Sequence, residues 1–169
     1  SDNMLFTWGY NSAGNLGDGT TTTRSSPVQI GTSSWTAIAA GTSHVAAIRS
    51  DGALFTWGGG AFGQLGDGTA SNKSSPVQIG TSSWTAVSTG SNHTKAIRSD
   101  GILFTWGRGT SNQLGDGALV DRSSPVQISS SSWTAVAGSY GDHNIAIKND
   151  GRLFAWGWNQ YGQITQSVG

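Results

Sequence analysis

The sequence predicts an all-β protein, a β-propeller of four-stranded antiparallel blades in which about three and a half repeats are present. The first observation behind this prediction is a block of about 49 residues that is written three times and begins a fourth time. The second is that each block holds several short apolar runs separated by turn sequences, without an apolar pattern at the 3.6-residue period of a helix. The third is that side-chain size increases along the successive runs, as expected for strands that radiate from an axis.

Three kinds of residue mark the period of the repeat. Each recurs at intervals of 49 or 50 residues: Trp8, Trp57, Trp106 and Trp156; Pro27, Pro76 and Pro125; His44, His93 and His143. A repeat of this size is one supersecondary unit that buries its apolar faces against its neighbours. We therefore treat residues 1–169 as a single repeat array, with units at approximately 5–53, 54–102 and 103–152 and a partial unit at 153–169.

The first two strands of a unit are predicted from the block that starts at Trp35. Residues 35–39 form a short run that ends before Gly41, and residues 44–49 form a second run. Both runs are rich in alanine, whereas the third run of the unit carries aromatic residues. Because radial sheets are crowded near the axis, we expect the alanines near the centre and the aromatic residues further out.

The third and fourth strands follow a hairpin signal. Asp51-Gly52 precedes a run at residues 54–58. An Asp-Gly pair between two apolar runs predicts a hairpin with a type I′ turn, in which both residues have positive φ. After a longer loop, Pro76 opens a fourth run at residues 75–79. Since proline cannot donate a ladder hydrogen bond, we expect this strand at the outer edge of its blade.

These motifs resemble the regulator of chromosome condensation repeat. The resemblance rests on Leu-Phe-Thr-Trp-Gly, Gln-Leu-Gly-Asp-Gly-Thr, Ser-Pro-Val-Gln-Ile and Gly-x-x-His followed by Asp-Gly, and it covers nearly the whole chain. It implies a propeller of about seven blades. The copies present here are too few to close such a ring, so we expect either a partial ring or a ring completed by other chains. We favour a segment of a longer protein, because residue 1 is not Met and residues 1–3 align with the hairpin turn at 50–52.

Composition narrows the classes of function. The chain has nine Lys and Arg against nine Asp and Glu, all of them Asp, and its net charge is zero. A neutral chain has no electrostatic basis for binding nucleic acid or anionic membrane. The chain has no Cys, and no apolar run approaches the roughly 20 residues that span a bilayer. We therefore expect no nucleic-acid partner and no membrane insertion.

Candidate catalytic, metal-ligating and cofactor-binding residues find structural explanations. His44, His93 and His143 occupy one slot in separate blades, where we expect ring nitrogens bonded to neighbouring loop backbone rather than a shared metal. Most Asp residues fall in the Gly-Asp-Gly loops or in the hairpin turns, where Asp satisfies local backbone donors. No serine lies in a nucleophile elbow, and the glycine-rich loops lack a phosphate-binding Lys. We predict that the protein is not an enzyme and needs no metal or cofactor.

The basic residues Arg24, Lys73 and Arg122 recur just before Ser-Ser-Pro. A row of cations can grip phosphate, but such residues are more often solvated positions on an outer strand, and Asp121 beside Arg122 weakens any patch. The resemblance implies roles in chromatin binding and in nucleotide exchange on a small GTPase. Neutral charge argues against the first role, and the second depends on loop elements that we cannot match to residues of this chain.

One face of the propeller varies from copy to copy. Antiparallel strands put the connections after the first and third strands at one face, and these are the connections whose sequences differ. We call this the variable face; it comprises residues 42–43, 91–92 and 139–142 and residues 10–13, 59–62, 108–111 and 158–161. Every aromatic residue outside the repeated framework maps to it, and with one arginine these form the candidate partner-binding set: Tyr10, Phe62, Arg108, Tyr140, Trp158 and Tyr161. In this loop Asn112 stands where the other copies have Gly, which predicts positive φ there.

From these features we expect a non-enzymatic structural or interaction module. Its Gly-, Ser- and Thr-rich, weakly charged composition suits a virion, secreted or cell-surface protein. Its partners would be proteins, including further copies of itself or the rest of a longer chain. Two alternatives stay open. A lectin would stack sugar rings on the aromatic residues of the variable face, so that a glycan is its partner. A regulator of a GTPase or of chromatin would follow the familiar role of the family.

Overall fold

The computed structural model is an all-β structure, and it describes residues 3–138 and 141–164. These described residues form eleven strands: β1 (Phe6–Gly9), β2 (Arg24–Gln29), β3 (Trp35–Ala40), β4 (His44–Arg49), β5 (Ala53–Gly58), β6 (Lys73–Thr89), β7 (His93–Arg98), β8 (Ile102–Gly107), β9 (Arg122–Gly138), β10 (His143–Lys148) and β11 (Leu153–Gly157). The described residues contain no helix with the length and apolar character of a membrane span.

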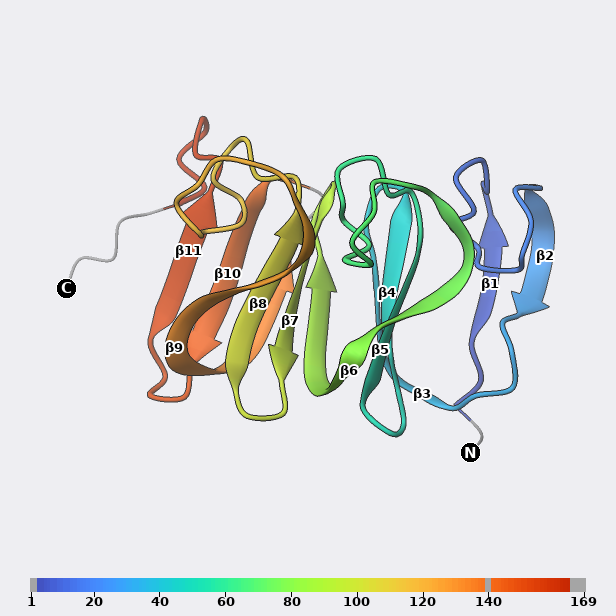
Figure 1. Cartoon of the computed structure of the whole chain (residues 1–169), viewed down its shortest axis with the longest axis horizontal. Helices are drawn as coiled ribbons and strands as arrows, with labels where there is room; N and C mark the ends of the chain where they lie inside the picture. Colours follow the sequence, from blue (N-terminus) through green and yellow to red (C-terminus); the bar gives the residue numbers. More distant parts are fainter. Residues whose placement is uncertain (1–2, 139–140, 165–169) are drawn as a thin grey trace.

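The strands form four consecutive blades, which Figure 1 shows side by side. Within the described part of the chain, blade 1 contains only β1 and β2. Blade 2 contains β3, β4, β5 and the first half of β6; blade 3 contains the second half of β6, then β7, β8 and the first half of β9; blade 4 contains the second half of β9, then β10 and β11. The antiparallel order within each blade confirms the predicted propeller, and the described blades form a partial ring that is not closed.

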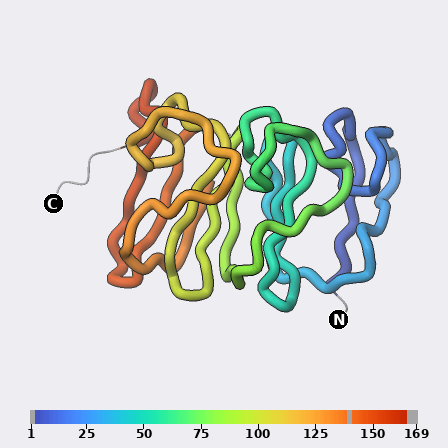
Figure 2. The backbone as a smooth tube through the Cα atoms, in the orientation of Figure 1, coloured from blue at the N-terminus to red at the C-terminus, as the bar shows by residue number. Residues whose placement is uncertain are grey.

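The outer strand of each complete blade pairs with one neighbour inside its blade, as the prolines predict. The register repeats in every copy: Gln29, Gln78 and Gln127 lie opposite Phe6, Phe55 and Phe104. Each 17-residue strand, β6 and β9, leaves the outer edge of one blade and continues as the innermost strand of the next. This continuous backbone ties each blade to its neighbour, and the path can be followed in Figure 2.

The hairpin between β4 and β5 differs from the predicted type I′ turn. Gly52 has φ +86°, but Asp51 does not have positive φ. The Gly52 amide donates to the Arg49 carbonyl at 2.8 Å, and the Asp51 carboxylate accepts from the Ala53 amide at 3.1 Å and from the Arg49 guanidinium at 2.7 Å. The loop is therefore one residue longer, with a left-handed glycine as its last residue. The same turn forms at Asp150-Gly151, where Lys148 stands in place of the arginine, so the bond from the aspartate to the amide two residues further on is the shared feature.

Side-chain size follows the spacing between neighbouring blades, as the sequence predicts. Backbones of neighbouring blades approach most closely where β3 and β4 face β6 and where β6 and β7 face β9. Between blades 2 and 3 the core contains small residues (Ala37, Ala46 and Ala96) beside large ones (Ile48, Leu54, Trp84 and Trp106). Trp84 meets Phe104 edge-on with ring centroids 5.5 Å apart. Alanines thus let inner strands come together, while indoles and phenyl rings fill the wider space outside.

The repeated histidines join blades to one another. His44 is 1% exposed, and its Nε2 lies 3.0 Å from Oγ1 of Thr94 on the next blade, which in turn donates to the Gln64 carbonyl at 2.7 Å. His93 is fully buried and its Nε2 lies 2.7 Å from Oδ1 of Asn144. The role is structural, as expected, but the partner is a side chain of the following blade rather than loop backbone. We call each of these buried contacts between neighbouring blades, His44 with Thr94 and His93 with Asn144, a polar joint.

The joint between blades 3 and 4 contains a buried lysine that sequence reasoning did not single out. Lys95 stands where the first copy has Ala46, is fully buried, and donates to Asn144 Oδ1. Burial lowers the pKa of Lys95 from 10.5 to about 7. A Cβ on Gly138 would overlap the Lys95 ammonium, whereas the equivalent position in the previous blade is Thr89. The joint between blades 2 and 3 has Ala46, Thr89 and Thr94. The equivalent residues in the joint between blades 3 and 4 are Lys95, Gly138 and Asn144.

The histidine joints predict a stability that falls with acidification. Burial and the nearby Lys95 charge lower the pKa of His44 from 6.5 to about 4 and that of His93 to about 3. The unfolded chain therefore binds more protons than the folded chain between pH 6.5 and about 4, and stability is lost as pH falls through that window. We expect the free energy of unfolding to drop by about 3 kcal/mol for His44 alone. Urea unfolding from pH 8 to pH 4 measures this slope.

The control for this prediction is His44→Gln, which removes one titrating group. The variant is less stable at neutral pH because a buried hydrogen bond changes, but its pH slope between 6.5 and 4 becomes shallower. The aspartates do not confuse the result, because Asp18 and Asp51, with pKa values lowered to about 2, lose their stabilising effect only below about pH 4. An unchanged slope in His44→Gln would contradict the assignment.

The lysine joint predicts compensation between two positions. Gly138→Thr alone places side-chain atoms where the Lys95 ammonium lies, and we expect a loss of about 2 kcal/mol or more from overpacking. Adding Lys95→Ala and Asn144→Thr recreates the residue set of the first joint, so most of the loss is recovered. Urea unfolding of the single, double and triple variants measures the coupling energy. Additive effects of Gly138→Thr and Lys95→Ala would contradict the proposed contact.

Candidate partner-binding face

The loops between the third and fourth strands of each blade are held from below by a buried leucine. Leu16, Leu65 and Leu114 are at most 4% exposed. The hydroxyl of the strand threonine beneath each loop donates to the carbonyl of that leucine at 2.7 Å, from Thr7, Thr56 and Thr105 respectively. The tips of these loops lie at the upper edge of Figure 1, together with the connections from the first to the second strands. This edge is the variable face.

An internal ion pair closes each loop. Asp18 pairs with Arg24 at 2.7 Å, Asp67 with Lys73 at 3.2 Å and Asp116 with Arg122 at 2.9 Å. Burial raises the pKa of Asp18, yet hydrogen bonds from Thr20 and Arg24 outweigh it and hold that pKa at about 2. Each of the three cations is therefore paired with a carboxylate of its own loop, although its side chain remains partly exposed. They belong to the loops, and the sequence position just before Ser-Ser-Pro did not reveal their partners.

A second anchor fixes the backbone just below the tip, and the copies build it in two ways. In the first copy the buried Asn11 donates to the Thr20 and Thr22 carbonyls, both at 3.1 Å. The second and third copies have Gly60 and Gly109 at this position. In these copies the acceptor comes from the residue just before the outer strand. Asn72 Oδ1 accepts from the Gly60 amide, and Asp121 Oδ1 accepts from the Gly109 amide, both at 3.0 Å. Asp121 thus has a structural role in this loop.

The backbone conformation of the tips is also conserved between copies. Asn112 has φ +60°, and the glycines at the equivalent positions, Gly14, Gly63 and Gly162, have φ between +74° and +79°. The positive φ predicted for Asn112 is therefore confirmed. A glutamine side chain then accepts from the amide at the tip, for example Gln64 Oε1 from Phe62 at 2.9 Å. The tip side chains are consequently presented by a fixed backbone.

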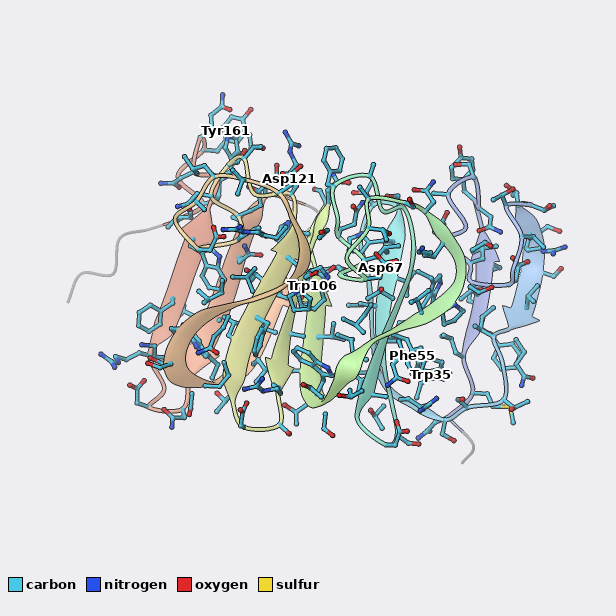
Figure 3. The ribbon with its side chains drawn as sticks, viewed as in Figure 1. Trp35, Phe55, Asp67, Trp106, Asp121 and Tyr161 are labelled. Atoms are coloured by element: carbon cyan, nitrogen blue, oxygen red, sulfur yellow. The ribbon has the colours of Figure 1, made fainter. Side chains whose placement is uncertain are left out.

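The structure places the described members of the candidate set on these tips. Tyr10 is 71% exposed and Tyr161 is 79% exposed, whereas Phe62 and Trp158 are each 37% exposed. Figure 3 shows Tyr161 projecting from the edge that also carries Asp121. Tyr140 lies outside the described residues. Among the described aromatic side chains of the variable face, Tyr10 and Tyr161 are thus the most accessible.

Contacts among the tip side chains form two separate groups on this face. The Arg108 guanidinium lies 5.6 Å from the Phe62 ring centroid, and its Nη1 lies 3.9 Å from Oδ2 of Asp142 on the next blade. Trp158 and Tyr161 meet edge-on with centroids 5.4 Å apart. The structure therefore brings Phe62 and Arg108 together and Trp158 and Tyr161 together, with Tyr10 apart from both pairs. Asp142 lies on the variable face as predicted, and its contact with Arg108 adds it to the residues around the candidate partner-binding set.

The ionisable groups described on this face are largely engaged with one another, and its exposed groups are mainly aromatic. Among the described residues, no group of three His, Asp, Glu or Cys side chains is placed to hold a metal ion. The loop carboxylates are engaged in ion pairs that lower their pKa values, as Thr69 and Lys73 do for Asp67 against the opposing effect of burial. Ionised, paired carboxylates are poor general acids at neutral pH. The exposed groups are aromatic rings and one arginine, which are typical anchors at protein interfaces.

Comparison with protein families gives repeated matches. A family model described as the regulator of chromosome condensation (RCC1) repeat matches residues 2–48, 51–97 and 100–147. A second model with the same description matches residues 35–64, 84–113 and 133–163. Compared with curated proteins, the sequence has no significant match.

Solved structures share the fold. Human WBSCR16 superposes with a TM-score of 0.85 at 23% identity, over 96% of this chain and 45% of that chain. Prp20p from Saccharomyces cerevisiae gives a TM-score of 0.72 at 24% identity, over 82% of this chain and 38% of that chain. Yeast RCC1 (Prp20) bound to Kap60 gives a TM-score of 0.76 at 22% identity, over 92% of this chain and 40% of that chain. The chain therefore spans less than half the length of each of these proteins.

The two forms of the tip anchor predict which substitutions matter. Asp121→Ala leaves the Gly109 amide without its acceptor, and we expect a loss of about 1 kcal/mol in unfolding free energy, with faster hydrogen exchange at Gly109. Asp121→Asn retains an acceptor oxygen and has a smaller effect. The matched control is Thr23→Ala, because Thr23 occupies the same loop position in the copy that uses Asn11 instead. Equal losses in Asp121→Ala and Thr23→Ala would contradict the anchor.

Proposed function

The chain belongs to the regulator of chromosome condensation (RCC1) repeat family, and from this membership we propose that it is a non-enzymatic interaction module whose variable face binds a protein partner. The observation that carries the proposal is the contrast within each loop. Anchors such as Asn11 are fully buried, while the neighbouring Tyr10 is 71% exposed. Exposed aromatic side chains on rigid loops lose little conformational entropy on binding, and such residues contribute most to interface affinity.

The absence of an enzymatic role is part of the proposal. It is supported by the engagement of the groups that acid–base chemistry would need. His44 and His93 are buried in blade joints, and burial lowers both of their pKa values far below neutrality. The hairpin carboxylates of Asp51, Asp100 and Asp150 are paired with arginines at 2.6–2.7 Å. A catalytic acid or base needs a pKa near the working pH and access to substrate.

The class of partner is proposed to be protein. Prp20p is described with binding to Gsp1p and histones, and yeast RCC1 (Prp20) is bound to Kap60 in its complex. For the present chain, the neutral net charge argues against an acidic partner held by electrostatics. The aromatic and single-arginine composition of the variable face instead suits a mixed apolar and polar protein surface. The Gly-, Ser- and Thr-rich, weakly charged build supports a place on a cell surface or virion.

The proposal predicts that removal of the exposed rings weakens binding strongly. A variant with Tyr10, Trp158 and Tyr161 each changed to Ser folds normally, because these side chains lie outside the blade cores, but loses at least about 30-fold in affinity for its partner. Partners are captured from candidate host extracts by cross-linking, identified, and then measured with purified protein by calorimetry.

The matched control changes the opposite edge of the array. Thr32→Ala, Thr81→Ala and Ser130→Ala alter exposed residues of the connections that lead from one blade to the next, and we expect them to leave affinity unchanged. A partner that binds both variants equally would overturn the proposal. If the only ligand found is a glycan on a glycan array, and Trp158→Ala weakens it, the lectin alternative replaces the protein-binding one.

A further inference from the structure

A groove lies between the outer parts of blades 2 and 3, both of which have all four of their strands within the described residues. Its volume is about 570 Å³, within the range of about 300–1,000 Å³ that is usual for small-molecule sites. Blade 2 contributes the first half of β6 and the loop at residues 66–69, and blade 3 contributes residues that include Trp84, Arg98 and Phe104. The groove is therefore an interior feature of the array, formed by two neighbouring copies of the repeat.

The groove contains a buried indole whose nitrogen has no acceptor. Trp84 lines the groove and is 6% exposed, and no described residue accepts a hydrogen bond from its Nε1. In the third copy the equivalent Trp133 Nε1 donates to Ser129 Oγ at 3.1 Å. The second copy has Gly80 at the position of Ser129, and Gly80 also lines the groove. Because a buried donor is costly to leave unpaired, a ligand atom that accepts from Trp84 Nε1 would take the place of the serine hydroxyl.

The neighbourhood of Gly80 leaves room for such an atom. Gln78 Nε2 donates to the Gly80 carbonyl and Gln127 Nε2 donates to the Ser129 carbonyl, both at 3.1 Å, so the two segments are anchored alike. Gly80 has φ +60°, a conformation that Ser129 does not share, and a Cβ placed on Gly80 meets no atom within 4 Å. Glycine thus leaves open a position that the third copy fills with a serine side chain.

Two ion pairs supply polar groups to the groove without giving it a net charge. Lys73 Nζ lies 3.2 Å from Asp67 Oδ2, and both residues line the groove. Arg98, which also lines it, pairs with Asp100 at 2.6 Å, and its guanidinium lies 4.8 Å from the Phe104 ring centroid. A charged ligand would have to compete with one of these resident partners, whereas a neutral ligand would not.

Hydroxyl groups suit these partners best. One hydroxyl can accept a hydrogen bond from the Lys73 ammonium while it donates another to the Asp67 carboxylate, and a second hydroxyl can accept from Trp84 Nε1. Val77 and Pro125 add apolar surface to the lining, against which the C–H groups of a sugar ring can pack. The groove therefore has the chemistry to bind a sugar rather than a phosphate or a cation.

We propose that the groove between blades 2 and 3 binds a short neutral saccharide, with one hydroxyl accepting from Trp84 Nε1 and another bridging Lys73 and Asp67. The lining includes none of the described candidate partner-binding residues, so this site is separate from the variable face and goes beyond the proposed function. It also differs from the lectin alternative, in which sugar rings would stack on the variable face.

Titration of the full chain with neutral disaccharides (maltose, cellobiose, lactose and N,N′-diacetylchitobiose) tests the site. We expect at least one of them to shift the Trp84 indole N–H signal saturably in proton–nitrogen correlation spectra. Trp84→Phe removes the donor, and Gly80→Ser with Thr81→Ser recreates the segment of the third copy and its acceptor; each change weakens binding, measured by calorimetry, about tenfold or more. Trp133→Phe is the matched control and retains the affinity, because that indole already has Ser129 as its acceptor. If Trp84→Phe fails to fold, the serine variant decides, since it leaves the core side chains unchanged.

The ion pair and the neutrality of the ligand have their own tests. Lys73→Met removes a donor of the groove, and we expect the same disaccharide to bind about tenfold more weakly. Arg122→Met changes the same position of the next copy, which lies outside the groove lining, and leaves the affinity unchanged. Digalacturonate is the charged probe, and it binds more weakly than the neutral disaccharides because a carboxylate would face Asp67.

The proposal is overturned if none of the disaccharides shifts the Trp84 signal, or if one of them binds the Trp84→Phe and serine variants as tightly as the unmodified chain. Tighter binding of digalacturonate than of every neutral probe would also overturn it. A disaccharide that loses affinity in Trp158→Ala but not in the groove variants binds the variable face, which would replace the groove site with the lectin alternative. These outcomes are distinct from those for the protein partner, which depend on the rings of Tyr10, Trp158 and Tyr161.

Discussion

Each blade of this protein depends on its neighbour, because a four-stranded sheet with two apolar faces has nothing else to cover them. No helix lies among the described strands, and the cores that form contain residues from successive blades. Stability is consequently shared along the array, as in other repeat proteins. The same dependence explains the graded exposure along the chain, in which Leu54 and Leu103 are fully buried and Leu153 is 60% exposed. Position within the repeat sets the chemistry of a residue, and position along the array sets its exposure.

Polar joints fix the blades in register where apolar packing alone would allow them to slide. His44 and His93 reach forward to Thr94 and Asn144, which then bond to carbonyls of the preceding loop, those of Gln64 and Gln113. A buried hydrogen bond contributes little net stability, but an unmade one is costly. A misplaced blade would leave several such groups unsatisfied. The two joints also differ in the sizes of their side chains, because one contains Ala46 and Thr89 where the other contains Lys95 and Gly138. This difference favours the native order of blades 2, 3 and 4 over other pairings of similar units.

The sequence predicts the fold well because its signals are local and repeated. The spacing of the tryptophans, the proline at the outer strand and the glycine positions of the loops each act within one unit. Joints between blades are harder to predict, because they pair residues about 50 positions apart, such as His93 with Asn144. The turn type was wrong because Asp-Gly alone does not set the loop length: in all three hairpins the Asp carboxylate accepts from the amide two residues further on, and only the glycine has positive φ. The coupled changes at Lys95, Gly138 and Asn144 are visible in an alignment of the copies, but their meaning requires the contact.

The variable face shows why the copies diverge where they do. A loop tip can change freely only if its backbone does not depend on its own side chains. In this chain the support comes from below, through Leu65 and Thr56, and from the side, through Asp67 and Lys73. Asn11 in one copy and Asp121 in another reach the same result from opposite ends of the loop. Two independent solutions to one anchoring problem indicate that the rigid backbone is the property retained, while the exposed rings are free to be fitted to a partner.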